Sequence, residues 1–564
     1  MAPADEYSVP QEAKQLLLQG IIDNPLHALA PDDIEAAALM IEYVGTHFPV
    51  IPINWRFAES ISAIKGFQGA MLNVLLKEKY GLDFQKIVID TDHAQLFIMS
   101  MILPVIDPHG AQVRPSDPRF YQYFPKCDKH EIGLDNACTS IYKTKDGRFY
   151  HLHGSFNIST IIHDVLDIPL DARPASVSEA GEIYQEKVSK YDAAEIENLM
   201  NDKYRQAGTT CWSMEEYKSS EHGKANAHVG LYEIHYVPNP KQAPRWWTNV
   251  EGKTSAARPL FGLKIVDLTR IVASPAVTRE LAELGASVMR ITSPNITDFT
   301  VLNLDMGWGK WNAHLDLTKE EDRKVLRSLI EECDVVVDGY RPGVMKKWGF
   351  GKEEILGFFA EKDRGVIYAQ ENCYGWNGPW SYRSGWQQIS DANCGVSLEF
   401  GRAMGNDEAV TPVFPNSDFC TGAAGATGIL QALIARSKTG GSYVVDIALN
   451  YYSQWLINSC STYSPEVWDK LWSNYGRPVF RHYDNMGVTI PKYMEMLMGK
   501  KAPIFDPKFF ENRENKALGV PVKTVKPILV FPDQVVRLEY NVGSRGNGVD
   551  QPKWPEDLLT EIVV

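Results

Sequence analysis

The spacing of hydrophobic positions changes near residue 260. Downstream of it, short apolar runs alternate with segments whose apolar residues recur every three or four positions, which predicts strands alternating with helices. The expected strands are 263–269, 287–292, 334–340, 365–371 and 443–449. The expected helices are 275–284, 319–332, 343–348 and 419–436. This alternation predicts a doubly wound, mostly parallel, Rossmann-like α/β sheet.

The chain before residue 237 has a different pattern. Its expected helices are 11–22, 32–45, 59–79, 92–103, 157–166, 177–190 and 192–206. One short buried strand is expected at 86–91. In 140–154, alternating aromatic residues flank Asp146-Gly147, which predicts a β-hairpin with a tight primed turn.

These patterns divide the chain into units. We expect a truncated front unit at 1–236, with a smaller α+β domain at about 106–235, and a proline-rich, charged linker at 237–259. A large Rossmann-like domain at 260–450 and a segment at 451–564 that completes the fold follow. The first strand-to-helix turn of the large domain lacks the GxGxxG glycines, which weighs against ordinary NAD binding.

Composition narrows the function classes. A formal net charge of −14 argues against nucleic acid or an anionic membrane as the main partner. The eight cysteines form no CxxC pair, and no signal-peptide pattern or membrane-length apolar run is present, so a cytoplasmic, intracellular protein is expected. His151 and His153 share one strand face without a matching Cys, Asp or Glu pattern, so no metal site is expected.

The stretch PNSDFCTGAAGATGILQAL (415–433) places Asp418 at the start of a helix whose first turns hold small residues. Asn416, Ser417 or Asp418 is an expected N-cap, because such side chains accept hydrogen bonds from the first free amides. The same amides and the helix dipole favour an ionised carboxylate and can hold an oxyanion, so Asp418 is also a candidate nucleophile. The residues alone leave both roles open.

Two helices share a glycine spacing. The matching pairs are Gly66 with Gly69 and Gly425 with Gly428. Counting back ten residues from the second glycine of each pair gives Glu59 and Asp418, both at a helix start. This spacing predicts an internal repeat, in which Glu59 is either a helix cap or a degenerate counterpart of Asp418.

Six segments of the back half carry a family resemblance. They are GLKIVDLTRIVASPAVTRELAELGASVMRI (262–291), HLDLTKEEDR (314–323), CDVVVDGYRPGVMKKWGF (333–350), GWNGPW (375–380), SGWQQISDANCG (384–395) and 415–449. In order and spacing they resemble the class III CoA-transferases, the CaiB/BaiF family. The resemblance implies an enzyme that moves CoA from an acyl-CoA donor to a small carboxylic acid. The family's nucleophile falls on Asp418, which would form an acyl-aspartyl anhydride and then an aspartyl-CoA thioester.

The resemblance also implies binding residues. CoA, a substrate and not a permanently bound cofactor, would contact Val272, Ala273, Leu315, Tyr340, Arg341, Lys346, Lys347 and Trp348. The basic residues among them supply the cations that a nucleotide diphosphate needs, although such a cluster is equally typical of a solvated helix face. The acid substrate would contact Gln387 and Gln388.

Several positions depart from the family pattern. Thr292 and Gly339 replace an acidic residue and an asparagine, and Trp386 stands where the racemase branch has a histidine, which disfavours a racemase. An acyl-CoA isomerase or lyase with Asp418 as base, or an inactive CoA-binding relative, stays an alternative. Family members are interlocked dimers, so we expect the hairpin near 145–154 to fold over Asp418 in a homodimer or in a pseudo-dimeric monomer.

Overall fold

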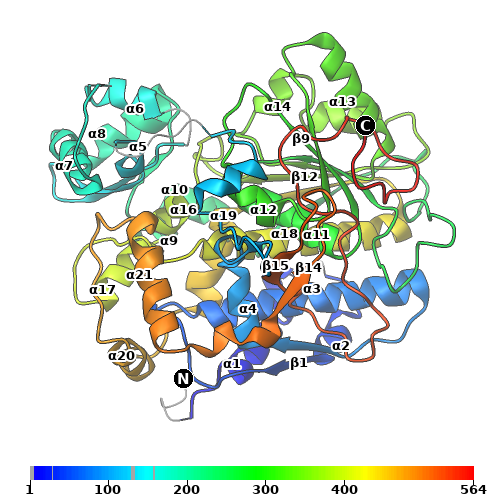
Figure 1. Cartoon of the computed structure of the whole chain (residues 1–564), viewed down its shortest axis with the longest axis horizontal. Coiled ribbons are helices and arrows are strands. Elements are labelled where there is room, and N and C mark those ends of the chain that lie inside the picture. The colour runs from blue at the N-terminus through cyan, green and yellow to red at the C-terminus, as the bar shows by residue number, and fades with distance from the viewer. Residues whose placement is uncertain (1–5, 28–29, 129–133, 156–158, 170) are drawn as a thin grey trace.

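A seven-stranded sheet organises the back half of the computed structural model, which describes residues 6–27, 30–128, 134–155, 159–169 and 171–564 (Figure 1). Its strands, in spatial order, are β10 (Lys310–His314), β9 (Ser287–Thr292), β8 (Lys264–Leu268), β11 (Val335–Asp338), β12 (Ile367–Asn372), β13 (Ser442–Ala448) and β7 (Glu233–Val237). All pair in parallel except β7, which is antiparallel to β13. This confirms the doubly wound class, with the order of a dinucleotide-binding sheet and its reversal between β8 and β11.

Helices of the back half lie between these strands. They are α11 (Ala273–Glu283), α12 (Asn303–Met306), α13 (Glu320–Glu332), α14 (Val344–Lys347), α15 (Lys352–Phe358), α16 (Gln387–Asn393), α17 (Val396–Ala403) and α18 (Asn416–Thr439). The sequence did not predict β10, because a lysine and an asparagine interrupt its apolar pattern. Lys310 is nevertheless buried, and its Nζ lies 3.0 Å from Asp267 Oδ2.

The front unit is built around one long helix. Its elements are α1 (Val9–Gln15), a π-helical continuation at Leu16–Ile22, α2 (Ile34–Leu39), β1 (Ile41–Val44), α3 (Phe57–Tyr80), β2 (Ile87–Asp90), α4 (Thr91–Phe97) and β3 (Val105–Ile106). The expected helix 32–45 is wrong in its second half. Residues 41–44 form a strand because they pair in parallel with 87–90.

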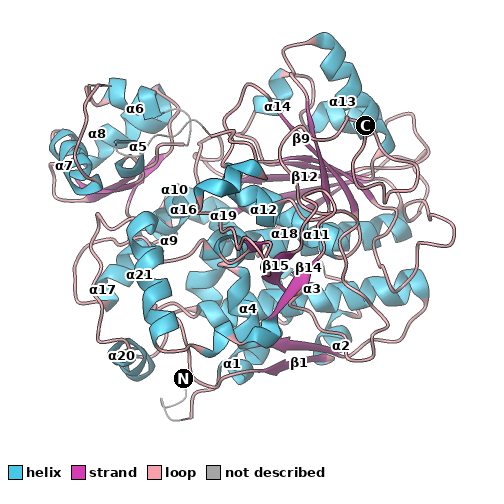
Figure 2. Ribbon diagram, viewed as in Figure 1, coloured by secondary structure: helices cyan, strands magenta, loops and turns pink. Residues whose placement is uncertain are grey.

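A smaller α+β lobe follows, at the upper left of Figure 2. It contains α5 (Leu134–Ala137), β4 (Ser140–Lys143), β5 (Phe149–Leu152), α6 (Ser159–Val165), α7 (Val177–Val188), α8 (Ala193–Glu197), a π-helical turn at Asn198–Lys203, and β6 (Gly208–Thr210). The hairpin of β4 and β5 is confirmed, but its expected two-residue primed turn is wrong. Only Gly147 has a positive φ, 80°, and the Thr144 N–H donates to the Arg148 carbonyl at 2.9 Å, so three residues form the turn.

The segment after β13 joins the front and back units. Its elements are α19 (Leu449–Trp455), α20 (Pro465–Asn474), α21 (Met486–Gly499), β14 (Phe510–Arg513) and β15 (Val522–Val525). β15 pairs with β3 of the front unit, while the Asp550 N–H donates to the Asn312 carbonyl of β10 at 2.8 Å. Two helices, α9 (Met214–Ser219) and α10 (Glu221–Asn226), precede β7, so the expected front unit ends inside a strand of the sheet. Among the helices described, none has both the length and the apolar character needed to cross a membrane.

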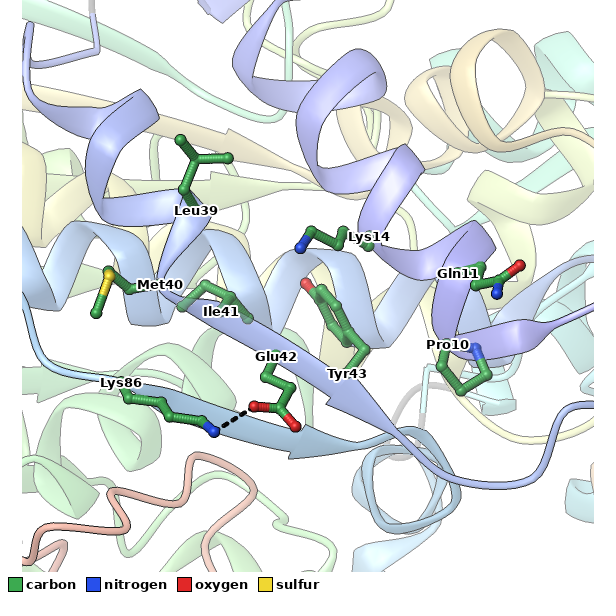
Figure 3. Close-up of a pocket in the computed structure, with 9 residues that line it drawn as sticks. All are labelled: Pro10, Gln11, Lys14, Leu39, Met40, Ile41, Glu42, Tyr43 and Lys86. Atoms are coloured by element: carbon green, nitrogen blue, oxygen red, sulfur yellow. Dashed lines mark ion pairs between the residues drawn. The ribbon is translucent and has the colours of Figure 1, made fainter.

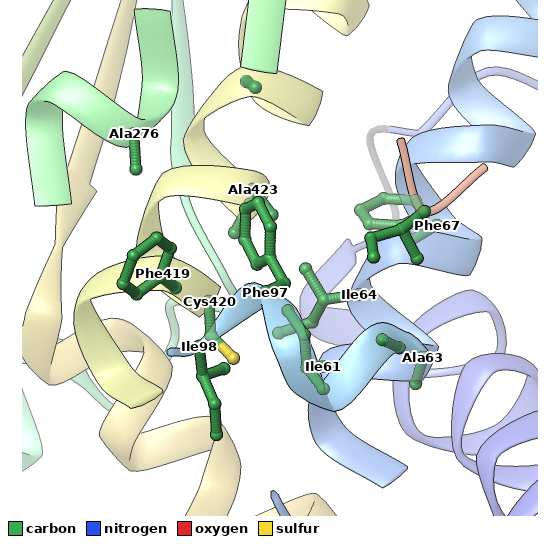
Figure 4. Packing of buried hydrophobic residues seen from close by; sticks show 14 of the residues in the cluster. Ile61, Ala63, Ile64, Phe67, Phe97, Ile98, Ala276, Phe419, Cys420 and Ala423 are labelled. Carbon is green, nitrogen blue, oxygen red and sulfur yellow. The ribbon is translucent and has the colours of Figure 1, made fainter. Parts of the chain in front are cut away.

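Helix α18 is buried on nearly all faces, between α11 on one side and α3 on the other (Figure 4). Its small residues permit this. A Cβ built on Gly422 would lie 2.5 Å from Ala276 Cβ, and one on Gly425 would lie 2.9 Å from Val277 Cγ2. Phe419 and Ala423 pack towards Phe97 and Ile64 on the other side. The glycines therefore set how closely α18 approaches α11.

Helices α3 and α18 start in the same way. Both are preceded by a residue in the inverse γ-turn conformation, Arg56 (φ −77°, ψ 62°) and Pro415 (φ −79°, ψ 57°). Glu59 and Asp418 are each the third helical residue. A repeat would produce this correspondence, and the internal repeat stays a prediction.

We expect Gly422→Ala to lower thermal stability, because its new methyl group forces α18 away from α11, at a cost of about 1–3 kcal/mol. Gly357→Ala in α15 is the matched control. A Cβ there meets no atom within 4 Å, so this change should stabilise the protein by about 0.5–1 kcal/mol. Thermal denaturation of the two variants checks both signs, and equal shifts would argue against the packing role of Gly422.

Candidate active site

A cavity of about 830 Å³ lies at the carboxyl edge of the sheet. Residues 270–273 after β8 and 339–342 after β11 form part of its wall, together with residues 371–373 at the end of β12. The strand order reverses between β8 and β11, so the cavity lies where open α/β sheets bind their ligands. Asp418 and Pro415, at the start of α18, line the same cavity.

Asp418 is the third residue of α18 and not its N-cap. Pro415 occupies the cap position and no side chain caps the helix, so the hypothesis that residues 416–418 supply the cap is wrong. The reason is the inverse γ-turn at Pro415, which starts the helix at Asn416. Phe414, just before this turn, has a positive φ of 60°, a strained conformation for an aromatic residue.

Two more carboxyl groups surround Asp418. Burial raises the pKa of Asp418 well above its ordinary value, and the carboxyls of Glu371 and Asp391 raise it further. Burial also raises the pKa of Asp391 to about 7, although Asp391 accepts hydrogen bonds from Ser417 Oγ, at 2.7 Å, and from Gln387 Nε2. The expectation that the helix start simply favours an ionised carboxylate is therefore incomplete, because burial and like charges oppose it.

A group of arginines marks one end of the site. Arg270 and Arg341 line the cavity, and Arg205 lies close enough for its charge to act on Arg341. Burial, Arg270 and Arg205 together lower the pKa of Arg341 to about 10. Within the described ranges none of the three has a carboxylate partner. Unpaired cations that repel one another are typical of a site for an anion such as a diphosphate.

Seven of the residues predicted from the sequence line this cavity. They are Val272, Ala273, Tyr340, Arg341, Gln387, Gln388 and Asp418. Four others lie outside its wall. Leu315 is buried in a second hydrophobic core with Trp348 packed against it, and Lys346 and Lys347 are exposed on α14. The binding roles of all eleven stay predictions.

The hairpin of the smaller lobe reaches the cavity. Its residues His151, His153 and Gly154 contribute to the wall, and the His153 ring stacks on Trp386, with centroids 4.9 Å apart. Burial lowers the pKa of His151 to about 4 and that of His153 well below its ordinary value, so both rings are neutral. The lobe and the large domain therefore share the site within one chain.

Part of the cavity wall is apolar. It includes residues 101–102 after α4 and the side chains of Ile296, Phe299, Val301 and Leu302 after β9, a segment that Arg270 contacts through the Thr297 carbonyl. The rest comes from α21, through Met486, Val488 and Ile490. These α21 side chains are partly exposed, and their only polar contact in the described chain is the hydrogen bond that Met486 Sδ accepts from Gln388 Nε2 at 3.7 Å, so this wall suits an apolar ligand body.

The sequence missed Glu371, Asp391, Arg270 and the α21 residues. Glu371 and Arg270 carry a signal in hindsight, because each lies at or just after the carboxyl end of an expected strand. No sequence signal linked α21 to the cavity, because its place beside the cavity depends on tertiary packing.

Glu59, the expected counterpart of Asp418, is enclosed. Its carboxylate accepts hydrogen bonds from Tyr7 Oη at 2.6 Å and Tyr463 Oη at 3.0 Å, and the side chain is fully buried. Burial raises the pKa of Glu59 in spite of the nearby Arg56 guanidinium. The arrangement gives Glu59 a structural role in the packing of the front unit.

Two other places have features of a site. A hollow of about 360 Å³ beside β1 has a mixed lining, in which Leu39, Met40 and Ile41 lie beside the ion pair of Lys86 and Glu42 (Figure 3). In the part of the chain that the structure describes, one group has metal-ligand spacing, Glu233, His235 and Asp446 on β7 and β13. Its carboxylates already accept hydrogen bonds from Tyr451 and Gln370, both at 2.6 Å. His151 and His153 do not belong to it.

Comparisons with known proteins point to one family. Residues 260–472 match the model of CoA-transferase family III. Over 572 residues the chain is 48% identical to the acetyl-coenzyme A transferase nodX of Hypoxylon pulicicidum, covering 100% of this chain and 96% of the relative. It is 31% identical to an acyl-CoA transferase of Gibberella moniliformis, over 90% of this chain and 89% of that one. A crystal structure of a CaiB/BaiF family protein from Brucella suis matches 36% of this chain and 55% of its own, at 27% identity and a TM-score of 0.33.

The contrast between a cation that lines the cavity and one on the exposed face of α14 gives a binding prediction. Arg341→Gln should weaken CoA binding about tenfold or more, because a charge-assisted hydrogen bond contributes about 1.5–3 kcal/mol. Lys346→Gln, on the exposed face of α14, should change the affinity less than about twofold. Calorimetric titration with CoA measures both. If Lys346→Gln causes the larger loss, the diphosphate lies on the exposed helix and not in the cavity.

Proposed function

The chain belongs to CoA-transferase family III and is a transferase that uses acyl-CoA, and we propose that it moves CoA to a carboxylic acid through covalent intermediates on Asp418. The observation that carries this proposal is the position of Asp418. Its carboxylate lines the cavity at the switch point of the sheet, near the start of a helix whose second and third N–H groups have no acceptor in the described chain. A cavity lined by both arginines and apolar side chains suits a CoA thioester, which has a charged nucleotide and an uncharged acyl end.

In the proposed first step, the ionised Asp418 carboxylate attacks the thioester carbonyl. The bond from Asp418 Oδ to the acyl carbon forms, the C–S bond breaks, and an acyl-aspartyl anhydride and CoA thiolate result. In the described chain, the N–H groups of Ser417 and Asp418 donate to no acceptor, which makes them candidate donors for the tetrahedral oxyanion.

In the second half of the reaction the CoA thiolate is the nucleophile and the aspartyl carbonyl is the group attacked. The thiolate attacks the aspartyl carbonyl of the anhydride, which releases the first acid and leaves an aspartyl-CoA thioester. The acceptor acid then attacks this thioester to form a new anhydride, and the returning thiolate takes the acceptor's acyl group. The raised pKa of Asp418 favours the chemistry, because a desolvated carboxylate is a stronger nucleophile than a solvated one.

The substrates follow from two observations. The relative that is 48% identical is named an acetyl-coenzyme A transferase, so acetyl-CoA is the proposed donor. The apolar wall from residues 296–302 and α21 favours an acceptor acid with an apolar body. Gln387 and Gln388 line the same cavity and are proposed to hydrogen-bond the acid, since they are neutral and do not demand a second carboxylate.

Incubation with acetyl-CoA should leave an acetyl or CoA adduct on the peptide that contains Asp418, detected by mass spectrometry after rapid quenching. Asp418→Asn should form no adduct and lose at least about 10³-fold in CoA exchange, because the amide is not a nucleophile. Asp407→Asn, an exposed carboxylate of the same region, is the control. Exchange of the acyl α-proton with solvent without an adduct would instead indicate an isomerase in which Asp418 acts as a base.

The apolar wall predicts a dependence on chain length. For straight-chain acceptor acids, kcat/KM should rise about fourfold per added methylene until the wall is covered, since each buried CH₂ contributes about 0.8 kcal/mol. Val488→Asn in α21 should flatten this slope, whereas Val479→Asn at an exposed position should not. A flat series for the parent protein, or a preference for short dicarboxylates, would contradict the assignment of the apolar wall to the acceptor.

A further inference from the structure

Glu371 is a second carboxyl group of the cavity that the proposed mechanism has not yet used. It is the fifth residue of β12, at the carboxyl end of the sheet, and its side chain lines the same cavity as Asp418. Only 9% of its surface is exposed. Its Oε2 accepts a hydrogen bond from Ser274 Oγ at 2.6 Å, and its Oε1 has no hydrogen-bond partner in the described chain.

The hydrogen bond to Ser274 depends on a glycine. A Cβ built on Gly339 would lie 2.2 Å from Ser274 Oγ and 2.5 Å from Ser274 Cβ. Any side chain at position 339 therefore displaces the serine that holds Glu371. Gly339, Ser274 and Glu371 come from the ends of β11, α11 and β12, so three elements build this arrangement together. The glycine that departs from the family pattern has a physical explanation here.

The charges around Glu371 favour retention of a proton. Burial, with a smaller effect of the Asp338 carboxyl, raises the pKa of Glu371 to about 7, while the Ser274 hydrogen bond opposes this rise. The other titratable groups that face this corner are Asp418 on α18, Asp391 on α16 and the Cys373 thiol after β12. The remaining charged or titratable groups of the cavity wall are Arg270, Arg341, Arg383, His151, His153 and Tyr340.

Glu371 and Asp418 are coupled, because the charge of one raises the pKa of the other. Over the pH range in which the pair holds a single proton, the higher pKa of Asp418 favours the proton on Asp418, and the reactive arrangement is the less populated one, with the proton on Glu371 and the charge on Asp418. This separation of roles gives one nucleophile and one acid from two carboxyl groups.

We propose that Glu371 is a catalytic acid and base that protonates the departing CoA sulfur and later deprotonates it. The inference rests on the proposed function, because it needs the anhydride on Asp418. In acylation, the Asp418 Oδ–acyl bond forms, the C–S bond breaks, and the Glu371 proton moves to sulfur. In the next step the thiol attacks the aspartyl carbonyl, the S–C bond forms, the acid leaves as a carboxylate, and the proton returns to Glu371.

With this role, CoA is held as a neutral thiol between the two half-reactions, and a neutral thiol is not drawn towards the arginines. Glu371 carries the negative charge until it removes the thiol proton in the next step. A carboxyl group with a pKa near neutral pH is suited to transfer a proton in both directions.

The test compares acetyl-CoA with its selenoester analogue, whose leaving group is more acidic and needs no protonation. In Glu371→Gln, the single-turnover rate of Asp418 acylation by acetyl-CoA should fall about 10²-fold, whereas acylation by the selenoester should fall less than about threefold. A structural role for Glu371 would reduce both rates equally. Glu361→Gln, an exposed carboxylate, is the control and should change neither rate.

The pH profile of acylation gives a second readout. In the parent protein the rate should rise as the pair loses its first proton and fall as it loses the second. Glu371→Gln should abolish the falling limb but should not shift the rising limb to lower pH, because Gln resembles the protonated Glu371 that is present while the pair loses its first proton. Ser274→Ala should move the falling limb to higher pH. In the parent protein the Ser274 hydrogen bond stabilises ionised Glu371, so its removal raises the pKa of Glu371.

Gly339→Ala should also move the falling limb to higher pH, because its methyl group displaces Ser274 from Glu371. This variant tests the role of Glu371 even if Glu371→Gln does not fold. If the parent protein forms the Asp418 adduct but Glu371→Gln retains the parent ratio of the acetyl-CoA and selenoester rates, the role of Glu371 is overturned and the proposed function stands. If the parent protein forms no adduct, both fall.

Discussion

The close approach of α18 to α11 determines the geometry of the site. Both helices start at the carboxyl edge of the sheet, and Gly422 and Gly425 remove the side chains that would hold them apart. As a result, Asp418 at the start of α18 shares one cavity with Val272 and Ala273 at the start of α11. The front unit contributes by covering the other side of α18 with α3, so the helix that carries Asp418 is enclosed on both sides.

This burial raises the free-energy cost of ionising Asp418, and no cation of the described site pairs with it to lower that cost. Glu371 and Asp391 are close enough to Asp418 to raise its cost of ionisation, while Arg270 and Arg341 line the cavity without pairing with any of the three carboxyls. The resulting potential is divided along the cavity. An anionic ligand is favoured near the arginines, and a single shared proton is retained near the carboxyls. A CoA thioester, with a charged nucleotide and a neutral reacting end, matches this division.

The fold and the site were predictable from the sequence where they depend on residues close together in the chain. Local patterns located β8, β9, β11, β12 and β13, and the family resemblance led to Asp418 and to six of the other residues that line the cavity. Local reasoning failed where long-range pairing decides the outcome. Residues 41–44 continue a helical pattern but become a strand because 87–90 offer an edge. The pKa of Asp418 depends on Glu371 and Asp391, whose proximity follows only from the packing of β12 and α16.

The part of the chain downstream of β13 has a consequence for how the cavity is enclosed. Met486, Val488 and Ile490 close one wall of the cavity, β15 pairs with β3 of the front unit, and Asp550 bonds to β10 of the sheet. Asp418 and the strands of the sheet precede these segments in the chain, so the cavity is enclosed only when the downstream segment has folded back against both units. Substitutions in α21 or β15 therefore affect the enclosure of the cavity without a change in any residue beside Asp418.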